Sequence, residues 1–151
     1  MIKFTNKNPK IRSFNICIFM VFCGLSAVQA ELTPEVLDLQ QRWAEVNYRL
    51  KDKNQIEAFN TLIEDARVIT QAQAETAEAW LWSGIIRSSY AGAKGGLGAL
   101  SAAKAAKVDL EKALELDPGV LEGAAYTSLG VLYLNVPGWP IAFGDDDVGV
   151  Q

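Results

Sequence analysis

The sequence contains no histidine, and its two cysteines, Cys17 and Cys23, lie close to the N-terminus. Without histidine the chain cannot form a Ser-His-Asp triad, and a tetrahedral zinc site would lack one of its usual ligand types. Catalysis by carboxylates alone is chemically possible, but no acidic pair stands out from an ordinary charged helix face. We therefore expect a protein that is not an enzyme and that uses no metal and no cofactor.

The sequence also lacks an apolar run long enough to cross a membrane. Its longest such run near the N-terminus covers residues 16–25, whereas a membrane-spanning helix needs roughly 20 apolar residues. Basic residues precede this run, and the small residues Val28 and Ala30 follow it at the spacing of a cleavage site. This layout predicts a signal peptide over residues 1–30 and export to the periplasm without membrane insertion. The alternative is an uncleaved N-terminal anchor.

A second alternative is a lipoprotein, because Cys23 lies late in the apolar run. The residue before a lipidated cysteine is usually small, whereas Phe22 is bulky. We therefore expect a free periplasmic protein rather than a lipid-anchored one.

Positive charge is scarce in the predicted mature chain. All 18 acidic residues of the sequence lie beyond residue 30, while four of the 14 basic residues lie before it. Cleavage would therefore change the formal net charge from −4 to −8. That charge disfavours binding to nucleic acids and to anionic membrane surfaces.

Beyond residue 30, apolar residues recur at helical spacing, which predicts an all-α fold. Thr33 is a good N-cap, and Pro34 suits the first helical position because its missing N–H would be unpaired there. Asp117-Pro118 should end a later helix. The predicted helices start at residues 33–34, 55, 76, 97 and 121, with a polar turn at residues 51–54.

The helices resemble tetratricopeptide (TPR) repeats. Trp80 followed four residues later by Gly84 is similar to the first helix of a repeat. Residues 107–118 resemble a second helix, and residues 125–133 resemble the first helix of the next repeat. The resemblance covers about residues 39–134 and implies an α-solenoid of stacked helical hairpins.

This resemblance places repeats at about residues 39–73 and 77–118, and a third at 123–151 that lacks its second helix. A repeat helix without its partner leaves an apolar face bare. We therefore expect the domain at residues 31–151 to be the N-terminal part of a longer solenoid.

A stretch rich in glycine and alanine at residues 91–106 departs from the ordinary repeat. Trp80 and Ala113 are 33 residues apart, whereas a regular 34-residue repeat would separate these landmarks by about 23. We expect the extra residues to be ordered and helical from Leu97 onward. The alternative, a phosphate-binding loop, would require a Gly-Lys-Ser/Thr ending that is missing here.

The segment Val136-Pro-Gly-Trp-Pro-Ile-Ala-Phe-Gly-Asp145 narrows the resemblance. It is similar to a loop in exported bacterial TPR proteins of the T-component group, which are associated with TRAP-type transporters. This resemblance implies a periplasmic protein that works beside a substrate-binding protein and can form a homo-oligomeric ring.

Two functions are consistent with these features. The first is a periplasmic scaffold for protein–protein interaction, accessory to a TRAP-type uptake system. The second is a carrier that binds an apolar or anionic small molecule. Arg87, Tyr90 and Lys94 could hold a carboxylate, or they could be an ordinary solvated helix end. Trp139 and Phe143 could anchor a partner or plug the fold.

Several side chains near these segments are expected to be buried in the core. Aromatic residues at helical spacing are more often core residues than binding platforms, and a loop with large apolar side chains must shield them. We expect Asp145 and the two acidic residues after it to start a helix, where they favour the helix dipole. The residues expected to be buried are Trp80, Trp82, Tyr126, Tyr133 and Ile141.

We expect export with cleavage after Ala30, because the small residues there follow a short apolar run at signal-peptide spacing. Mass spectrometry of the exported protein should find a chain that begins at Glu31. A chain that begins at Met1, or one lipidated on Cys23, would contradict this expectation.

Overall fold

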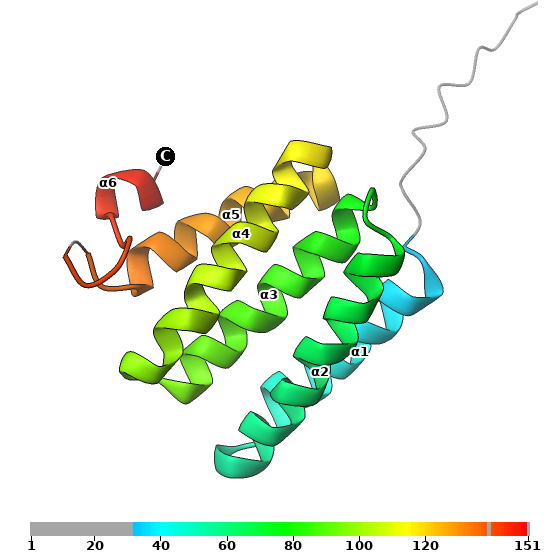
Figure 1. The fold of residues 1–151 in the computed structure, drawn as a ribbon, viewed down its shortest axis with the longest axis horizontal. Coiled ribbons are helices and arrows are strands. Elements are labelled where there is room, and N and C mark those ends of the chain that lie inside the picture. Colours follow the sequence, from blue (N-terminus) through cyan, green and yellow to red (C-terminus); the bar gives the residue numbers. More distant parts are fainter. Residues whose placement is uncertain (1–31, 139, 151) are drawn as a thin grey trace, which may run out of the picture. The chain divides into compact units, whose positions relative to one another are not determined.

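The computed structural model describes residues 32–138 and 140–150 (Figure 1). The predicted signal peptide and Trp139 lie outside these residues. Within the described part, the protein is all α-helical, as expected. The elements are α1 (Pro34–Arg49), α2 (Asp52–Ala72), α3 (Ala77–Lys94), the 3-10 turn η1 (Leu97–Ala99), α4 (Leu100–Leu116), α5 (Val120–Asn135) and α6 (Asp146–Gly149).

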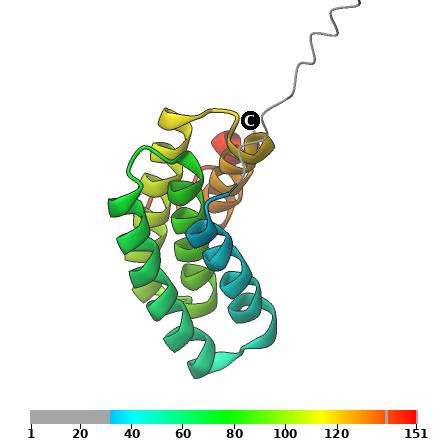
Figure 2. The same ribbon diagram turned by 90° about the vertical axis from the view of Figure 1, so that its right-hand side faces the viewer.

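Each helix packs against the next one along the chain, and α3 also contacts α1 and α5 (Figures 1 and 2). One hydrophobic cluster joins α3, α4 and α5, and another joins α1, α2 and α3. The central helix α3 therefore contributes to both clusters. Among the described residues, no helix has the length and hydropathy needed to span a membrane.

The first helix begins where the sequence predicts. The Thr33 side chain accepts a hydrogen bond from the backbone N–H of Val36 at 3.4 Å, and Pro34 takes the first helical position. This capping satisfies one N–H that the helix itself cannot pair. Leu39 and Val46 then face the core.

The start of α2 differs from the prediction, because α2 begins at Asp52 rather than near Gln55. The expected polar turn at 51–54 therefore shortens to Leu50 and Lys51. Helix start is favoured here by an acidic residue in the first turn. Gln55 also donates hydrogen bonds to the carbonyls of Val46 and Asn47 at the end of α1, which lack helical partners.

The region richest in glycine and alanine is ordered and helical from Leu97 onward, as expected. It forms the turn and first half of a long α3–α4 hairpin. The two helices cross closely at Gly84. A Cβ atom at this position would lie 2.6 Å from Cγ of Leu110 and 3.2 Å from the carbonyl oxygen of Ala106. Glycine is therefore required by the crossing.

The expectation that Tyr126 is a core residue is wrong, since its side chain is 58% exposed. Its neighbour Ala125 and the later Leu129 and Leu132 face α4 and are buried. Successive helical residues are about 100° apart, so Tyr126 points outward. Trp82 is buried as expected, whereas Trp80 and Tyr133 are partly buried against the core. Ile141 is also exposed, against expectation.

The last acidic residues start a helix, as expected. Asp145 caps α6 by accepting hydrogen bonds from the backbone N–H groups of Asp147 and Val148 at 3.0 and 3.1 Å. Its own N–H donates to the carbonyl oxygen of Tyr133 at 3.1 Å. Asp145 therefore ties the segment after α5 back onto that helix.

We expect Gly84→Leu to lower the free energy of unfolding by about 1–3 kcal/mol, because the added side chain overpacks the crossing. Gly92→Leu in the same helix is the matched control, since a Cβ there would meet no atom within 4 Å. The control should be neutral or more stable by up to about 1 kcal/mol, because it removes a helical glycine. Urea unfolding measures the free energy of unfolding of both variants. Equal effects would contradict the close crossing.

Candidate functional site

A cavity of about 700 Å³ that could hold a ligand lies at one end of the helices. It lies between the last turns of α3, the first turns of α4 and the last turns of α5, which Figure 1 shows on the same side of the molecule. It is lined by Ser88, Ser89, Ala91, Gly92, Gly95, Gly96, Leu97, Ala99, Leu100, Ala103, Val131, Leu132, Asn135, Val136 and Pro137.

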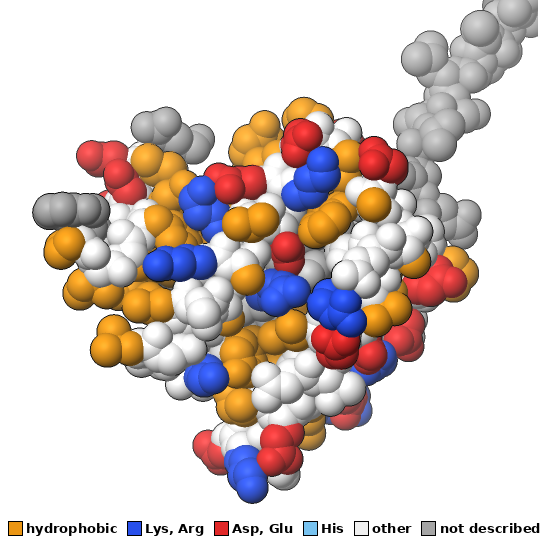
Figure 3. Space-filling view, viewed as in Figure 1, with side chains coloured by type: hydrophobic (Ala, Val, Ile, Leu, Met, Phe, Trp, Pro, Cys, Tyr) orange, Lys and Arg blue, Asp and Glu red, His pale blue; other side chains and the backbone are white. Residues whose placement is uncertain are grey.

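The lining divides into a buried floor and an exposed mouth. Ala91, Ala103 and Leu132 are buried and form the floor. Leu97, which is 78% exposed, and Val131 lie at the mouth. None of the lining residues carries a charge. Figure 3 shows hydrophobic side chains gathered over this end of the molecule.

The long α3–α4 hairpin makes the cavity possible. Its turn contains Gly95 and Gly96, both with positive φ, which suits glycine because it has no Cβ. Small residues at the end of α3 and the start of α4 leave space that larger side chains would fill. The inserted residues predicted from the sequence therefore supply two of the three cavity walls.

The segment after α5 completes the third wall with Val136 and Pro137. This segment is held closed by backbone contacts, because the N–H of Gly144 donates to the carbonyl oxygen of Pro137 at 3.0 Å. A Cβ at Gly144 would lie 1.7 Å from the carbonyl oxygen of Val136. No other residue fits at Gly144 without moving this wall.

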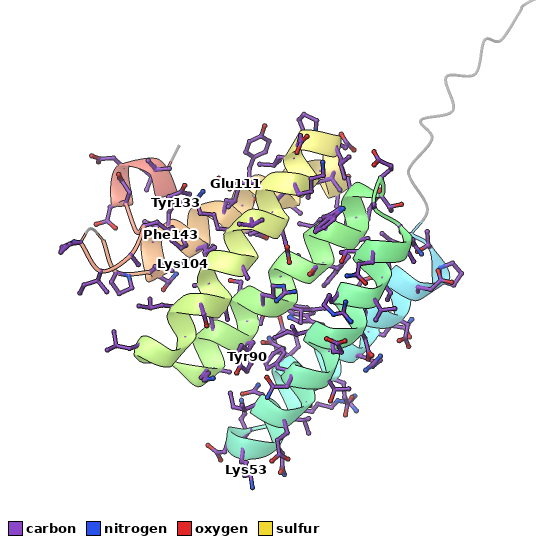
Figure 4. All side chains as sticks on the ribbon, in the orientation of Figure 1. Lys53, Tyr90, Lys104, Glu111, Tyr133 and Phe143 are labelled. Atoms are coloured by element: carbon purple, nitrogen blue, oxygen red, sulfur yellow. The ribbon has the colours of Figure 1, made fainter. Side chains whose placement is uncertain are left out.

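An aromatic and ionic cluster fastens the same segment to α4 and α5. The rings of Tyr133 and Phe143 meet edge to face with centroids 5.5 Å apart, and Figure 4 shows them together. The Lys107 amine lies 5.9 and 6.0 Å from these two centroids and is paired with Glu111. Burial alone would lower the pKa of Lys107, but the interactions with Glu111 and, to a smaller extent, with Tyr133 outweigh burial and raise it.

Arg87, one of the predicted site residues, is already paired inside the protein. Its Nε donates to Oδ2 of Asp109 on α4 at 2.8 Å, and the hydroxyl of Ser83 donates to the same oxygen at 2.6 Å. Asp109 is only 7% exposed. Arg87 thus binds a carboxylate, but the carboxylate belongs to the chain and joins α3 to α4.

Tyr90 and Lys94 are brought together by the structure, but away from the cavity lining. The Lys94 amine donates to the hydroxyl of Tyr90 at 2.9 Å and lies 5.2 Å from its ring centroid. The Tyr90 ring packs edge to face on Phe59 of α2. The cation of Lys94 is therefore directed to Tyr90.

Of the two loop residues predicted as site residues, Phe143 belongs to the cluster that fastens the cavity wall, and Trp139 lies outside the described residues. The cavity itself was not predicted from the sequence. The sequence feature that accompanies the cavity is the excess of small residues at 91–106. From the sequence alone, these residues indicate only close helix packing. The cavity also requires that α5 lies near residues 91–106, and this is a tertiary contact that the sequence does not show.

Outside the cavity lining, one buried polar group lacks a hydrogen-bond partner among the described residues. The indole N–H of Trp82 makes no hydrogen bond among the described residues. The ring lies edge to face against Trp43 with centroids 5.5 Å apart. Trp82 belongs to a cluster of α1, α2 and α3 residues and not to the cavity. In the described part of the chain, no group of acidic side chains is placed to hold a metal ion.

Comparison with known proteins gives no relative: no protein-family model, no curated protein and no solved structure matches the chain.

We expect Asp109→Ala to lower the free energy of unfolding by about 2–4 kcal/mol, because it leaves the half-buried Arg87 guanidinium without its partner. Glu45→Ala is the control, since it removes an exposed pair with Arg49 and should cost no more than about 0.5 kcal/mol. Urea unfolding compares the two. Equal losses would show that the buried pair does not stabilise the α3–α4 contact.

Proposed function

We propose that this chain is a non-catalytic, exported binding protein built from TPR-like helical hairpins, and that it holds an apolar ligand in the cavity between α3, α4 and α5. The observation that carries this proposal is the cavity itself, whose lining is mostly apolar and carries no charged side chain. Its volume of about 700 Å³ falls in the range of roughly 300–1,000 Å³ that is usual for small-molecule sites.

The geometry favours an apolar ligand over the anionic one that the sequence left open. Arg87 and Lys94 already have partners within the chain, and neither lines the cavity. An anion in the cavity would lose its hydration without gaining a counter-charge, which is costly. An apolar ligand instead gains free energy from each part of its surface removed from water.

A periplasmic scaffold is the second candidate, and exposed apolar side chains favour it. Tyr126, Leu134 and Ile141 on α5 and the following segment are all more than one third exposed. Exposed apolar side chains mark a protein interaction site when they form a contiguous patch. The loop resemblance suggests a substrate-binding protein of a TRAP-type system as the partner, with this chain as an accessory component.

The test uses residues 31–151 and two uncharged probes, 1-decanol and 2-naphthol, titrated by calorimetry at pH 7.5. We expect at least one probe to bind, and Gly92→Leu to weaken that binding at least about tenfold, because Gly92 lines the cavity and a side chain there would extend into open space next to it. Gly92→Ala is the matched control with a small effect. Gly92→Leu should fold normally, since leucine favours helix more than glycine does.

Binding that Gly92→Leu leaves unchanged would place the ligand elsewhere. If neither probe binds, while a TRAP-type substrate-binding protein does, the scaffold function replaces the carrier function.

A further inference from the structure

We propose that the cavity selects an uncharged molecule with a flexible aliphatic chain and a small neutral polar head, such as a long-chain alcohol or amide. This inference rests on the proposed function and adds the chemical class of the ligand. Three properties of the lining carry it: charge, shape and the position of its polar groups.

The charge of the site excludes ionised head groups. No Lys, Arg, Asp or Glu lines the cavity. The cations next in the chain to lining residues are Arg87, which is paired with Asp109, Lys94, which donates to Tyr90, and Lys104, which is not itself a lining residue. A carboxylate or ammonium head would therefore meet no opposite charge in the lining, and its desolvation would oppose binding.

The shape of the lining favours a slim chain over a ring system. The lining holds no aromatic side chain, so an aromatic ligand would find no ring to stack on. Alanine and glycine on α3 and α4 form one side, and the aliphatic residues Val131, Leu132 and Val136 form the other. A flexible chain can follow such a surface and bury its methylene groups, each worth about 0.8 kcal/mol when fully buried.

The polar groups of the lining are neutral. The hydroxyl of Ser89 lies 2.9 Å from the indole nitrogen of Trp43, which donates to it. The Asn135 amide group donates to the carbonyl oxygen of Val131 at 2.7 Å, which leaves its amide oxygen as an acceptor at the exposed end of α5. A hydroxyl or amide head at the mouth can donate to this oxygen, whereas an ionised carboxylate has no proton to donate to it.

The experiment compares 1-decanol, sodium decanoate and 2-naphthol by calorimetry with residues 31–151 at pH 7.5. For the unchanged protein, we expect 1-decanol to bind at least about tenfold more tightly than either of the other two. Decanoate has the same number of carbon atoms with a charged head, and 2-naphthol is uncharged but rigid and aromatic. The first comparison therefore tests the charge of the head, and the second tests the flexible chain against a ring system.

Val131→Lys tests the charge argument. Val131 lines the mouth and is 51% exposed, so a lysine there can keep its amine in water while it faces the ligand head. We expect this variant to shift the ratio of decanoate to decanol affinity toward decanoate by at least about fivefold. Val108→Lys is the matched control, because Val108 is 61% exposed on α4 and does not line the cavity. The control should leave the ratio unchanged.

The outcomes separate the two proposals. Binding of 2-naphthol or decanoate as tight as that of 1-decanol, lost in Gly92→Leu, would keep the carrier function and overturn the ligand class. Absence of binding for all three probes would overturn both. Equal shifts in Val131→Lys and Val108→Lys would show that the head group does not lie at the mouth.

Discussion

The close crossing of α3 and α4 is the contact on which the other helices depend. Gly84 lets the two backbones approach, and Leu110 fills the space that a side chain at Gly84 would take. One turn further along α3, the Arg87–Asp109 pair with Ser83 fixes the register of the two helices. This buried charge pair favours one register, because a shift of either helix would leave a buried charge without its partner. Helices α2 and α5 then pack on either side of this hairpin.

The cavity follows from how this hairpin extends beyond its neighbours. Buried alanines pack the end of α3 and the start of α4 together, and their small side chains leave little bulk to fill the space toward α5. The segment after α5 closes the remaining side. It is held there by the Lys107 amine, which lies over the rings of Tyr133 and Phe143. The same small residues that allow tight packing within the hairpin thus leave a gap beside it. An apolar ligand could occupy this gap without any change in the helices.

Much of the helical framework could be predicted from local signals. The Thr33-Pro34 start, the Asp117 stop and the Asp145 cap each rest on backbone groups within a few residues, and the structure confirms them. The start of α2 was missed because Gln55 pairs with carbonyls of the preceding helix. Tyr126 was misjudged because helical spacing places residues on a face but does not say which face another helix covers.

The sequence by itself determined the all-helical class, the ordered helix after Leu97 and the absence of histidine chemistry, since these depend on residue type and short-range spacing. Only the tertiary structure decided that Arg87 is paired with Asp109 and that the lining near Val131 forms a cavity with the α3–α4 turn. These partners lie 22 residues apart for the ion pair and on separate helices for the cavity. Helix packing determines which side chains from distant parts of the chain meet. The periodicity of apolar residues along the sequence does not contain this information.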